Sequence, residues 1–271
     1  PIYECEYKYC VSQKEFLMIP GNVIAYWLSP EFSHLFKNNV LLQEYALPRQ
    51  GLATGDNDRF IRYWYEVDYS KIGFDFVSTE DFQATKKLYA PYNKGGEYRK
   101  WYGNRELVIK FDSKNYICLM KQGNHLPSRQ LYFREGINWT ALTISDFSCR
   151  YTENGFVFDT KGSSCFTNHD DIMYLLALLN SKVANTVLKV LSPTMDYNCG
   201  TVGKIPVILP DCNTKICIEQ LAKACVELVK KSWDSHETSW GFHGKRTRTD
   251  GKTIEAEYVL YEQNMKEISS Q

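Results

Sequence analysis

Between Arg59 and Thr160, short runs of β-branched and aromatic residues are separated by Gly, Asn and Asp. These runs are Phe60–Val67, Arg105–Phe111, Gln130–Arg134, Ile137–Ile144 and Phe156–Asp159. Such side chains fit the pleated surface of a sheet, and the residues between them are typical of turns. The sequence therefore predicts a β-rich core from about Gln50 to Thr160, built from many short strands.

Helix signals lie on both sides of this core. Ser29, Pro30 and Glu31 supply a capping side chain, a proline for the first position and a carboxylate in the first turn, which together indicate a helix start. The run Ile172–Asn180 follows two aspartates and is apolar on nearly every side, so we predict a helix inside a domain. Another apolar stretch covers Val183–Leu191 and extends this helical region.

An edge strand and further helices are predicted after this helical region. Gly203–Pro210 contains two prolines, which an edge strand tolerates because one of its sides needs no partner. The apolar spacing after Asp211 is helical and runs past Trp233. Residues 241–253 are basic and glycine-containing, which favours a mobile loop, and a last charged helix is predicted to end at Gln271. The resulting prediction is an α+β fold in three parts, a lead-in of residues 1–49, a β-rich domain of residues 50–210 and a helical spacer and C-terminal region of residues 211–271.

Composition narrows the class of protein. With 44% hydrophobic and 24% charged residues in 271, the chain can bury a substantial core, which excludes wholesale disorder. No run approaches the roughly 20 apolar residues that cross a bilayer. The nine cysteines form no close pair and follow no apolar signal segment, so we expect free thiols and a cytoplasmic protein without membrane partners. Because the chain begins at Pro1, we expect it to be part of a longer protein.

Charge is balanced overall but uneven along the chain. The formal net charge is zero, which argues against coating nucleic acid by bulk attraction. Between Ala84 and Lys110, however, seven Lys and Arg residues stand against two Glu residues, and Lys121–Arg134 holds three cations and no acidic residue. Two basic segments of this kind indicate one positive face, and the alternative is an ordinary solvated surface.

The loop Gly51–Phe60 combines glycines with polar side chains. It lacks the GKS/T of a phosphate-binding loop, the glycine spacing of a dinucleotide fingerprint and the terminal glutamate of a calcium loop. We therefore predict that Thr54, Asn57 and Arg59 contact DNA while the neighbouring aspartates fix the turn. The alternative is a tight turn between two strands.

A second loop, Tyr92–Asn104, carries a denser set of recognition groups. Amides such as Asn93 can pair with adenine, cations can neutralise phosphates or read guanine, and aromatic rings can stack or wedge between bases. We predict phosphate contacts from Lys94, Arg99, Lys100 and Arg129, and base contacts from Asn93, Trp101 and Asn104. The complete set of predicted DNA-binding residues is Thr54, Asn57, Arg59, Asn93, Lys94, Arg99, Lys100, Trp101, Tyr102, Asn104, Arg129 and Arg134.

Motifs that carry chemistry are missing. The chain has no GxSxG, no HExxH, no Cys and His spacing that indicates a nucleophile, and no zinc template. It also lacks the Asp/Asn-Pro-Pro-Tyr tetrapeptide and the glycine-rich turn that holds S-adenosylmethionine. We therefore expect no catalytic residue, no metal site and no cofactor in this part of the protein.

Four segments resemble one family. Gly51–Phe60, Pro91–Asn104, Leu178–Val183 and Trp233–Trp240 are similar, in order, to the C-terminal half of PglX-type adenine-specific DNA methyltransferases. Those enzymes serve BREX phage-defence systems and are similar to type IIG restriction-modification proteins. The helix followed by Gly203–Pro210 also resembles the end of type I specificity domains, where a spacer helix begins.

The resemblance implies a division of roles. It identifies residues 50–210 as a target recognition domain that binds double-stranded DNA, with 1–49 leading in from an upstream methyltransferase domain that uses S-adenosylmethionine. It assigns the loops Thr54–Arg59 and Asn93–Asn104 to recognition and Trp233, Glu237 and Trp240 to one helical face that packs. The alternative is a protein-interaction scaffold whose aromatic face contacts other subunits of a defence complex, and a nuclease would need paired carboxylates holding Mg²⁺.

Overall fold

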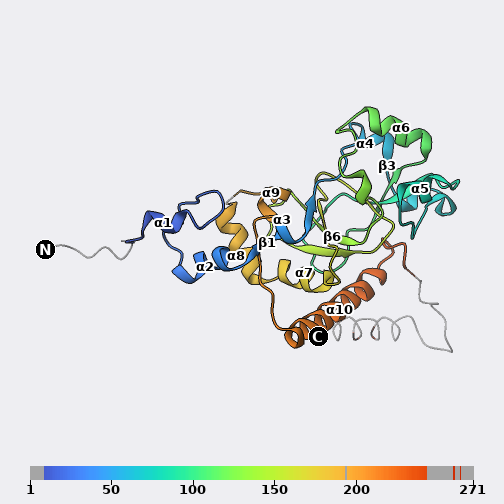
Figure 1. Cartoon of the computed structure of the whole chain (residues 1–271). Helices are drawn as coiled ribbons and strands as arrows, with labels where there is room; N and C mark the ends of the chain where they lie inside the picture. Colours follow the sequence, from blue (N-terminus) through green and yellow to red (C-terminus); the bar gives the residue numbers. More distant parts are fainter. Residues whose placement is uncertain (1–8, 193, 243–258, 260–262, 264–271) are drawn as a thin grey trace.

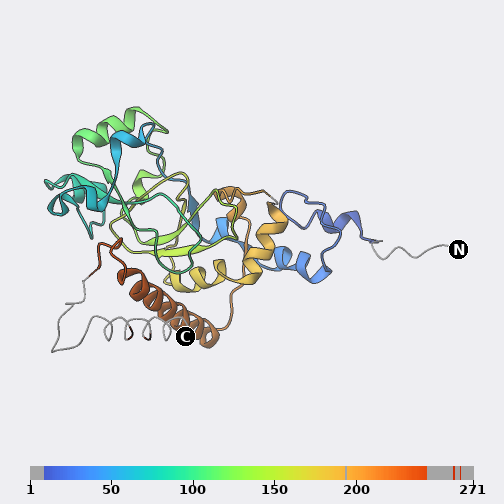
Figure 2. The same ribbon diagram turned by 180° about the vertical axis from the view of Figure 1, so that it is seen from behind.

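The computed structural model describes residues 9–192 and 194–242, together with Val259 and Gln263. Helices and short strands are mixed along the chain, and the strands form three small sheets. This mixture confirms the predicted α+β class. β1, β6 and α7 lie in the middle of the molecule, and α1 and α2 lie at the opposite end from β3, α4 and α5 (Figure 1 and Figure 2). None of the helices in the described residues combines the length and apolar content that a membrane crossing requires.

Four antiparallel strands form the first sheet, in the order β2-β9-β6-β7. Their bounds are β2 Leu47–Arg49, β6 Gly136–Trp139, β7 Cys149–Thr152 and β9 Ser164–Phe166. β6 and β9 are buried along their whole length, so polar side chains on them must find partners inside the protein. Asn138 does so, because its Nδ2 donates to the carbonyl oxygens of Gly162 at 2.6 Å and Ser163 at 3.1 Å.

The second sheet has the order β3-β5-β4-β8 and mixes strand directions. Its strands are β3 Ile61–Tyr63, β4 Tyr89–Asn93, β5 Leu107–Lys110 and β8 Val157–Phe158. β4 pairs antiparallel with β5 and parallel with β8, so it is enclosed on both edges where Tyr92 lies opposite Val157. β8 and β9 follow each other closely in the chain, so this segment joins the two four-stranded sheets.

A two-stranded sheet ties the start of the chain to its later part. β1 Val40–Leu41 pairs antiparallel with β10 Pro206–Val207. The edge strand predicted at Gly203–Pro210 is therefore present but short. Because β2 also pairs with β9, residues on both sides of the predicted boundary at residue 49 share sheets, and the three-part division of the chain stays a prediction.

The longer helices are α2 Pro30–Asn38, α6 Ser113–Lys121, α7 Ile172–Leu179, α8 Lys182–Leu191 and α10 Cys212–Asp234. Four of them follow the sequence prediction, but α6 lies inside the predicted β-rich core, where we expected no helix. Side-chain caps start two of them, since Ser181 accepts from the amide of Ala184 and Asp211 accepts from those of Asn213 and Thr214. α7 packs against β6 and β7 on one side and against α10 on another, which explains why it is apolar nearly all round (Figure 1).

Short helices and helical turns fill the connections between these elements. They are α1 Gln13–Phe16, α3 Leu42–Tyr45, α4 Asn57–Phe60, α5 Thr79–Gln83, α9 Cys199–Val202, and the 3-10 turns η1 Trp64–Glu66, η2 Tyr69–Lys71 and η3 Arg129–Leu131. Two main clusters of buried apolar residues form the core. One lies between the first sheet and helices α7, α8 and α10, and the other lies beside the second sheet.

Several predicted strand positions are wrong. Gln130–Arg134 forms a 3-10 turn and a bend in which Phe133 adopts a φ of 68°, although Leu131, Tyr132 and Phe133 are all buried. Phe60–Val67 is a strand only over Ile61–Tyr63, because η1 follows it directly. Conversely, the end of β4 overlaps Tyr92–Asn104, which we predicted to be a loop.

The C-terminal prediction holds in part. α10 starts after Asp211 and ends at Asp234, with Ser235 as its cap. Glu237 therefore lies beyond the helix and is exposed, so the predicted helical face shared with Trp233 and Trp240 is wrong. Trp240 instead packs against Phe74 and Phe156 from the following turn. The predicted loop 241–253 from residue 243 onward and the last helix to residue 271 fall outside the described residues, apart from the isolated positions 259 and 263.

Candidate nucleic-acid interface

The two recognition loops meet at one groove on the surface. Asn57 and Lys94 line a hollow of about 560 Å³ together with Tyr63. Arg99 and Asn104 line a neighbouring hollow of about 320 Å³ that also includes Tyr63. Because the hollows share this tyrosine, they form one continuous surface, which we call the Tyr63 groove. Its cationic and amide side chains are Asn57, Arg62, Lys94, Arg99 and Asn104.

Acidic side chains line the same groove and limit its net charge. Asp58 and Glu66 lie in the first hollow, and Glu97 and Glu106 lie in the second. Because the groove carries both cationic and acidic side chains, its charge alone attracts a polyanion only weakly. It offers, however, donors for guanine and adenine and acceptors for the cytosine amino group. The groove therefore offers both hydrogen-bond donors and acceptors with little net charge.

Tyr63, which lines both hollows, stacks on a second exposed tyrosine, Tyr65. The rings of Tyr63 and Tyr65 stack with centroids 5.3 Å apart and planes 12° from parallel, and 42% and 57% of these residues are exposed. Glu66 fixes the backbone here, because its Oε2 accepts from the amide of Tyr63 at 2.9 Å. Open flat rings suit stacking on a base. Sequence reasoning placed both tyrosines in a strand and missed their exposed stack, although the aromatic run that contains them was a usable signal.

The first loop is held by its own polar groups. Asp56 caps α4 by accepting from the amide of Arg59 at 3.1 Å. Thr54 is buried, and its Oγ1 donates to Asn57 Oδ1 at 2.7 Å. Thr54 therefore has no surface for DNA, and the predicted contact is corrected: it orients Asn57, which is exposed.

The glycines of this loop approach the chain's own backbone. A Cβ at Gly51 would lie 1.9 Å from the carbonyl oxygen of Phe158, and one at Gly55, where φ is +71°, would lie 3.1 Å from the amide nitrogen of Gly123. The close approach that the sequence indicated is therefore an internal one. It leaves no room against the backbone for a phosphate or a nucleotide cofactor at these positions.

The second loop is fixed to β7 and to α7. The amide of Trp101 donates to the carbonyl of Cys149 at 2.8 Å, and that of Tyr151 donates back to the carbonyl of Trp101 at 2.8 Å. Trp101, which we predicted to contact bases, is half-buried against the first core and lines neither hollow of the Tyr63 groove. Between these contacts and β4, Gly95 and Gly96 adopt φ values of +91° and +130°, which favour glycine. The loop therefore presents its side chains from a fixed backbone.

Lys100 is used to hold this loop. Its Nζ donates to the carbonyl of Asn180 at 2.8 Å, at the C-terminal end of α7, where a cation suits the helix dipole. Asn180 in turn pairs its side-chain amide with both backbone groups of Cys149, at 2.9 and 3.0 Å. We therefore move Lys100 from the predicted phosphate contacts to the residues that position the loop, and the Leu178–Val183 segment acts as the anchor.

A buried cation lies in the sheet next to this loop. Arg150 is 2% exposed, and its Nη2 donates to Asn138 Oδ1 at 3.0 Å and to Thr140 Oγ1 at 3.3 Å. Thr140 donates onward to the carbonyl of Gly96 at 3.0 Å. Burial lowers the pKa of the Arg150 guanidinium to about 10, so it remains charged at neutral pH. Arg150 therefore supports the glycine pair from inside and adds positive charge near the groove.

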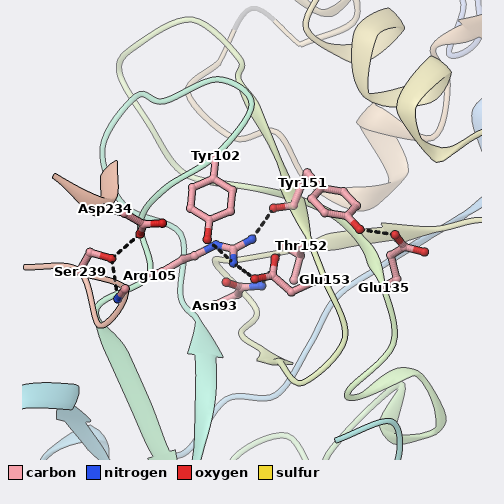
Figure 3. A network of polar contacts seen from close by, with 10 residues as sticks. Asn93, Tyr102, Arg105, Glu135, Tyr151, Thr152, Glu153, Asp234 and Ser239 are labelled. Atoms are coloured by element: carbon pink, nitrogen blue, oxygen red, sulfur yellow. Dashed lines mark hydrogen bonds and ion pairs between the residues drawn. The ribbon is translucent and has the colours of Figure 1, made fainter. Parts of the chain in front are cut away.

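A second buried guanidinium organises the other side of the loop (Figure 3). Arg105 donates to the hydroxyl of Tyr102 at 3.0 Å, to the carbonyl of Tyr151 at 2.8 Å and to the carboxylate of Glu153. Its guanidinium also lies 3.8 Å from the centre of the Tyr102 ring. Tyr102 is 3% exposed, so the predicted DNA contact is corrected to a structural role. Arg105, counted among the surface cations from sequence, belongs to the interior.

Asn93 is also internal. It is 5% exposed, and its Nδ2 donates to Thr152 Oγ1 at 3.2 Å within the same region (Figure 3). A buried amide that already pairs with a neighbouring strand cannot read adenine, so this predicted base contact is corrected as well. The residues that remain available in the groove are Asn57, Lys94, Arg99 and Asn104. Of these, Arg99 is exposed and lies 5.0 Å above the ring of Trp233.

The three remaining predicted residues lie outside the Tyr63 groove. Arg59 is exposed, with its Nη2 3.6 Å from Cys118 Sγ on α6. Arg129 and Arg134 line a separate hollow of about 370 Å³. Within the described residues, no group of three or more His, Cys, Asp or Glu side chains could hold a metal ion. The structure therefore separates the predicted residues into a groove, a second hollow and an internal framework.

Sequence comparison relates the chain to adenine-specific methyltransferases, although no family model matches it. It is 37% identical over 245 residues to the adenine-specific methyltransferase PglX of Lacticaseibacillus casei (strain Zhang), an alignment that covers 87% of the chain and 20% of that protein. It is 35% identical over 253 residues to the adenine-specific methyltransferase BrxX of Escherichia coli O9:H4 (strain HS), covering 92% and 20%. The chain thus corresponds to a segment of these PglX and BrxX proteins and spans about a fifth of their length.

Proposed function

We propose that this chain is a DNA sequence-recognition module of an adenine-specific methyltransferase. The observation that carries the proposal is the Tyr63 groove, where two loops separated in sequence bring together two amides, three cations and Tyr63, whose exposed ring stacks on Tyr65. This combination supplies phosphate contacts, base-edge contacts and a stacking surface at one place. Lys94 and Arg99 are the proposed phosphate contacts, and Asn57 and Asn104 are the proposed base contacts.

Recognition and chemistry are divided in this proposal. The longer parent protein methylates the exocyclic amine of an adenine in double-stranded DNA, as part of a BREX-type phage-defence system, and its catalytic part lies upstream. In this proposal S-adenosylmethionine binds in that upstream part. This chain contributes the surface that holds the duplex, in the cytoplasm.

An exposed aromatic cluster supports the alternative of a protein-interaction scaffold. Tyr9, Tyr26 and Trp27 contact one another and are each about half exposed. They come from the N-terminal segment that contains α1 and leads into α2, and Figure 1 shows these two helices far from β3. Such a cluster suits contact with another protein surface, including other subunits of a defence complex. Separate variants of the two aromatic surfaces distinguish these functions.

Replacing Tyr63 with alanine is expected to weaken binding of a fluorescent DNA duplex by about 5- to 100-fold, since removal of a stacked ring costs roughly 1–3 kcal/mol per base. Fluorescence anisotropy titration at constant salt measures this change. Tyr9→Ala is the matched control, because Tyr9 is also exposed and also contacts a second tyrosine. Equal weakening in both variants, or a wild-type chain that binds no duplex, would favour the scaffold.

A further inference from the structure

A second hollow lies beside α5 and α6, outside the Tyr63 groove. It has a volume of about 370 Å³ and is lined by side chains from α5, α6 and the segment around η3. Arg129 and Arg134 both line it, and Thr79, Glu80 and Tyr116 are among the other residues in its wall. The hollow shares no lining residue with the Tyr63 groove.

The two guanidinium groups in this wall have weak partners. Arg129 Nη1 lies 3.8 Å from Met120 Sδ, and Arg134 Nη2 donates to Asn168 Oδ1 at 3.3 Å. Within the described residues, neither forms an ion pair with a carboxylate. Glu80 also lines the hollow, but it is exposed and makes no ion pair with either arginine there. Both guanidinium groups therefore keep donors that an anion can use.

A buried hydroxyl in the same wall has no partner. Thr79 is 9% exposed, and its Oγ1 is one of the few buried polar atoms in the described part of the chain without a hydrogen bond. Leaving such a group unpaired is costly, so a ligand that bonds to it gains free energy. Tyr116 is a second hydroxyl-bearing residue in the wall. Two arginines and two hydroxyl-bearing side chains thus line one hollow.

We propose that this hollow binds the oxyanion of a phosphate group, through the guanidinium groups of Arg129 and Arg134 and the hydroxyl of Thr79. Arginine pairs well with phosphate oxygens because its planar fork of donors matches their geometry. The phosphate comes either from the backbone of bound DNA, in which case the inference rests on the proposed function, or from a free phosphorylated molecule.

Titration with inorganic phosphate tests the site without DNA. We expect phosphate to raise the melting temperature of the chain in a saturable way, compared with sodium chloride of equal ionic strength. The double variant Arg129→Met with Arg134→Met is expected to abolish this effect. Thr79→Val, which keeps the shape but removes the hydroxyl, is expected to weaken phosphate binding by about tenfold. Arg59→Met is the matched control and should bind phosphate like the wild type.

A second arm identifies the source of the phosphate. If it belongs to DNA, the double arginine variant should lower the slope of log affinity against log salt by about one unit in a duplex titration. An unchanged slope, with phosphate binding by the wild type, assigns the hollow to a free phosphorylated molecule. The inference is overturned if phosphate stabilises no more than chloride, or if either variant binds phosphate like the wild type. Failure of the duplex to bind at all would remove the proposed function, and the phosphate arm would still decide this site.

Discussion

Replacing Arg105 with methionine is expected to lower the free energy of unfolding by about 3–5 kcal/mol, the usual cost of removing one partner from a buried ion pair. Arg105 is 2% exposed and serves three acceptors, the hydroxyl of Tyr102, the carbonyl of Tyr151 and the carboxylate of Glu153. Methionine fills a similar volume but donates to none of them, so these groups are left without a partner inside the protein. Urea denaturation followed by circular dichroism measures the change.

Arg99→Met is the matched control for this experiment. Arg99 also lies over an aromatic ring, that of Trp233, but it is exposed and has no ion pair within the described residues. Its replacement should cost about 1 kcal/mol or less. Adding Glu153→Gln to the Arg105 variant should recover part of the stability, because it removes the charge left behind. Similar midpoints for the Arg105 and Arg99 single variants would show that the buried network contributes little.

The double variant Lys94→Ala with Arg99→Ala is expected to weaken duplex binding by about a hundredfold at about 50 mM salt, roughly tenfold for each phosphate left without its cation. Both cations line the Tyr63 groove and make no ion pair within the described residues. The slope of log affinity against log salt should fall by about two units. Anisotropy titrations at several salt concentrations measure the affinity and the slope together.

Lys37→Ala controls for the loss of a positive charge outside the groove, one charge against the two that the groove variant loses. Lys37 is exposed in the last turn of α2, at the far end of the molecule from β3 and α4 (Figure 1). Its removal should leave the slope within error of the wild type, because screening makes distant charges ineffective. If the groove variant and the Lys37 variant changed the slope equally, binding would depend on overall charge and not on the groove.

Secondary structure was predicted correctly where the sequence pattern of apolar and capping residues extends over many residues. α7 and α10 followed from apolar runs and caps that extend over many residues, so local misreadings did not alter them. Strands of two to five residues are too short for their pattern of apolar residues to identify them. Leu131, Tyr132 and Phe133 are consecutive apolar residues, which predicted a strand; they are all buried, yet the chain turns there with Phe133 at positive φ. Tertiary packing in the second core decided their conformation.

The site was predictable as a pair of loops but not residue by residue. Sequence chemistry selected amides and cations, and the structure places Asn57 and Lys94 on one groove. It could not separate those from Asn93 or Lys100, whose partners Thr152 and Asn180 are remote in the chain. A polar side chain that reads DNA and one that completes a sheet or a helix end are the same residue types. Only the fold distinguishes them.

Hydrogen–deuterium exchange of the chain with and without a DNA duplex tests the central claim, that the Tyr63 groove is the DNA-binding surface, most directly. We expect the duplex to slow exchange in peptides covering residues 55–66 and 94–106, which line the groove, and to leave α2 unchanged. Equal exchange in both groove segments, with protection confined to the aromatic cluster around Tyr26 or to another face, would contradict the account.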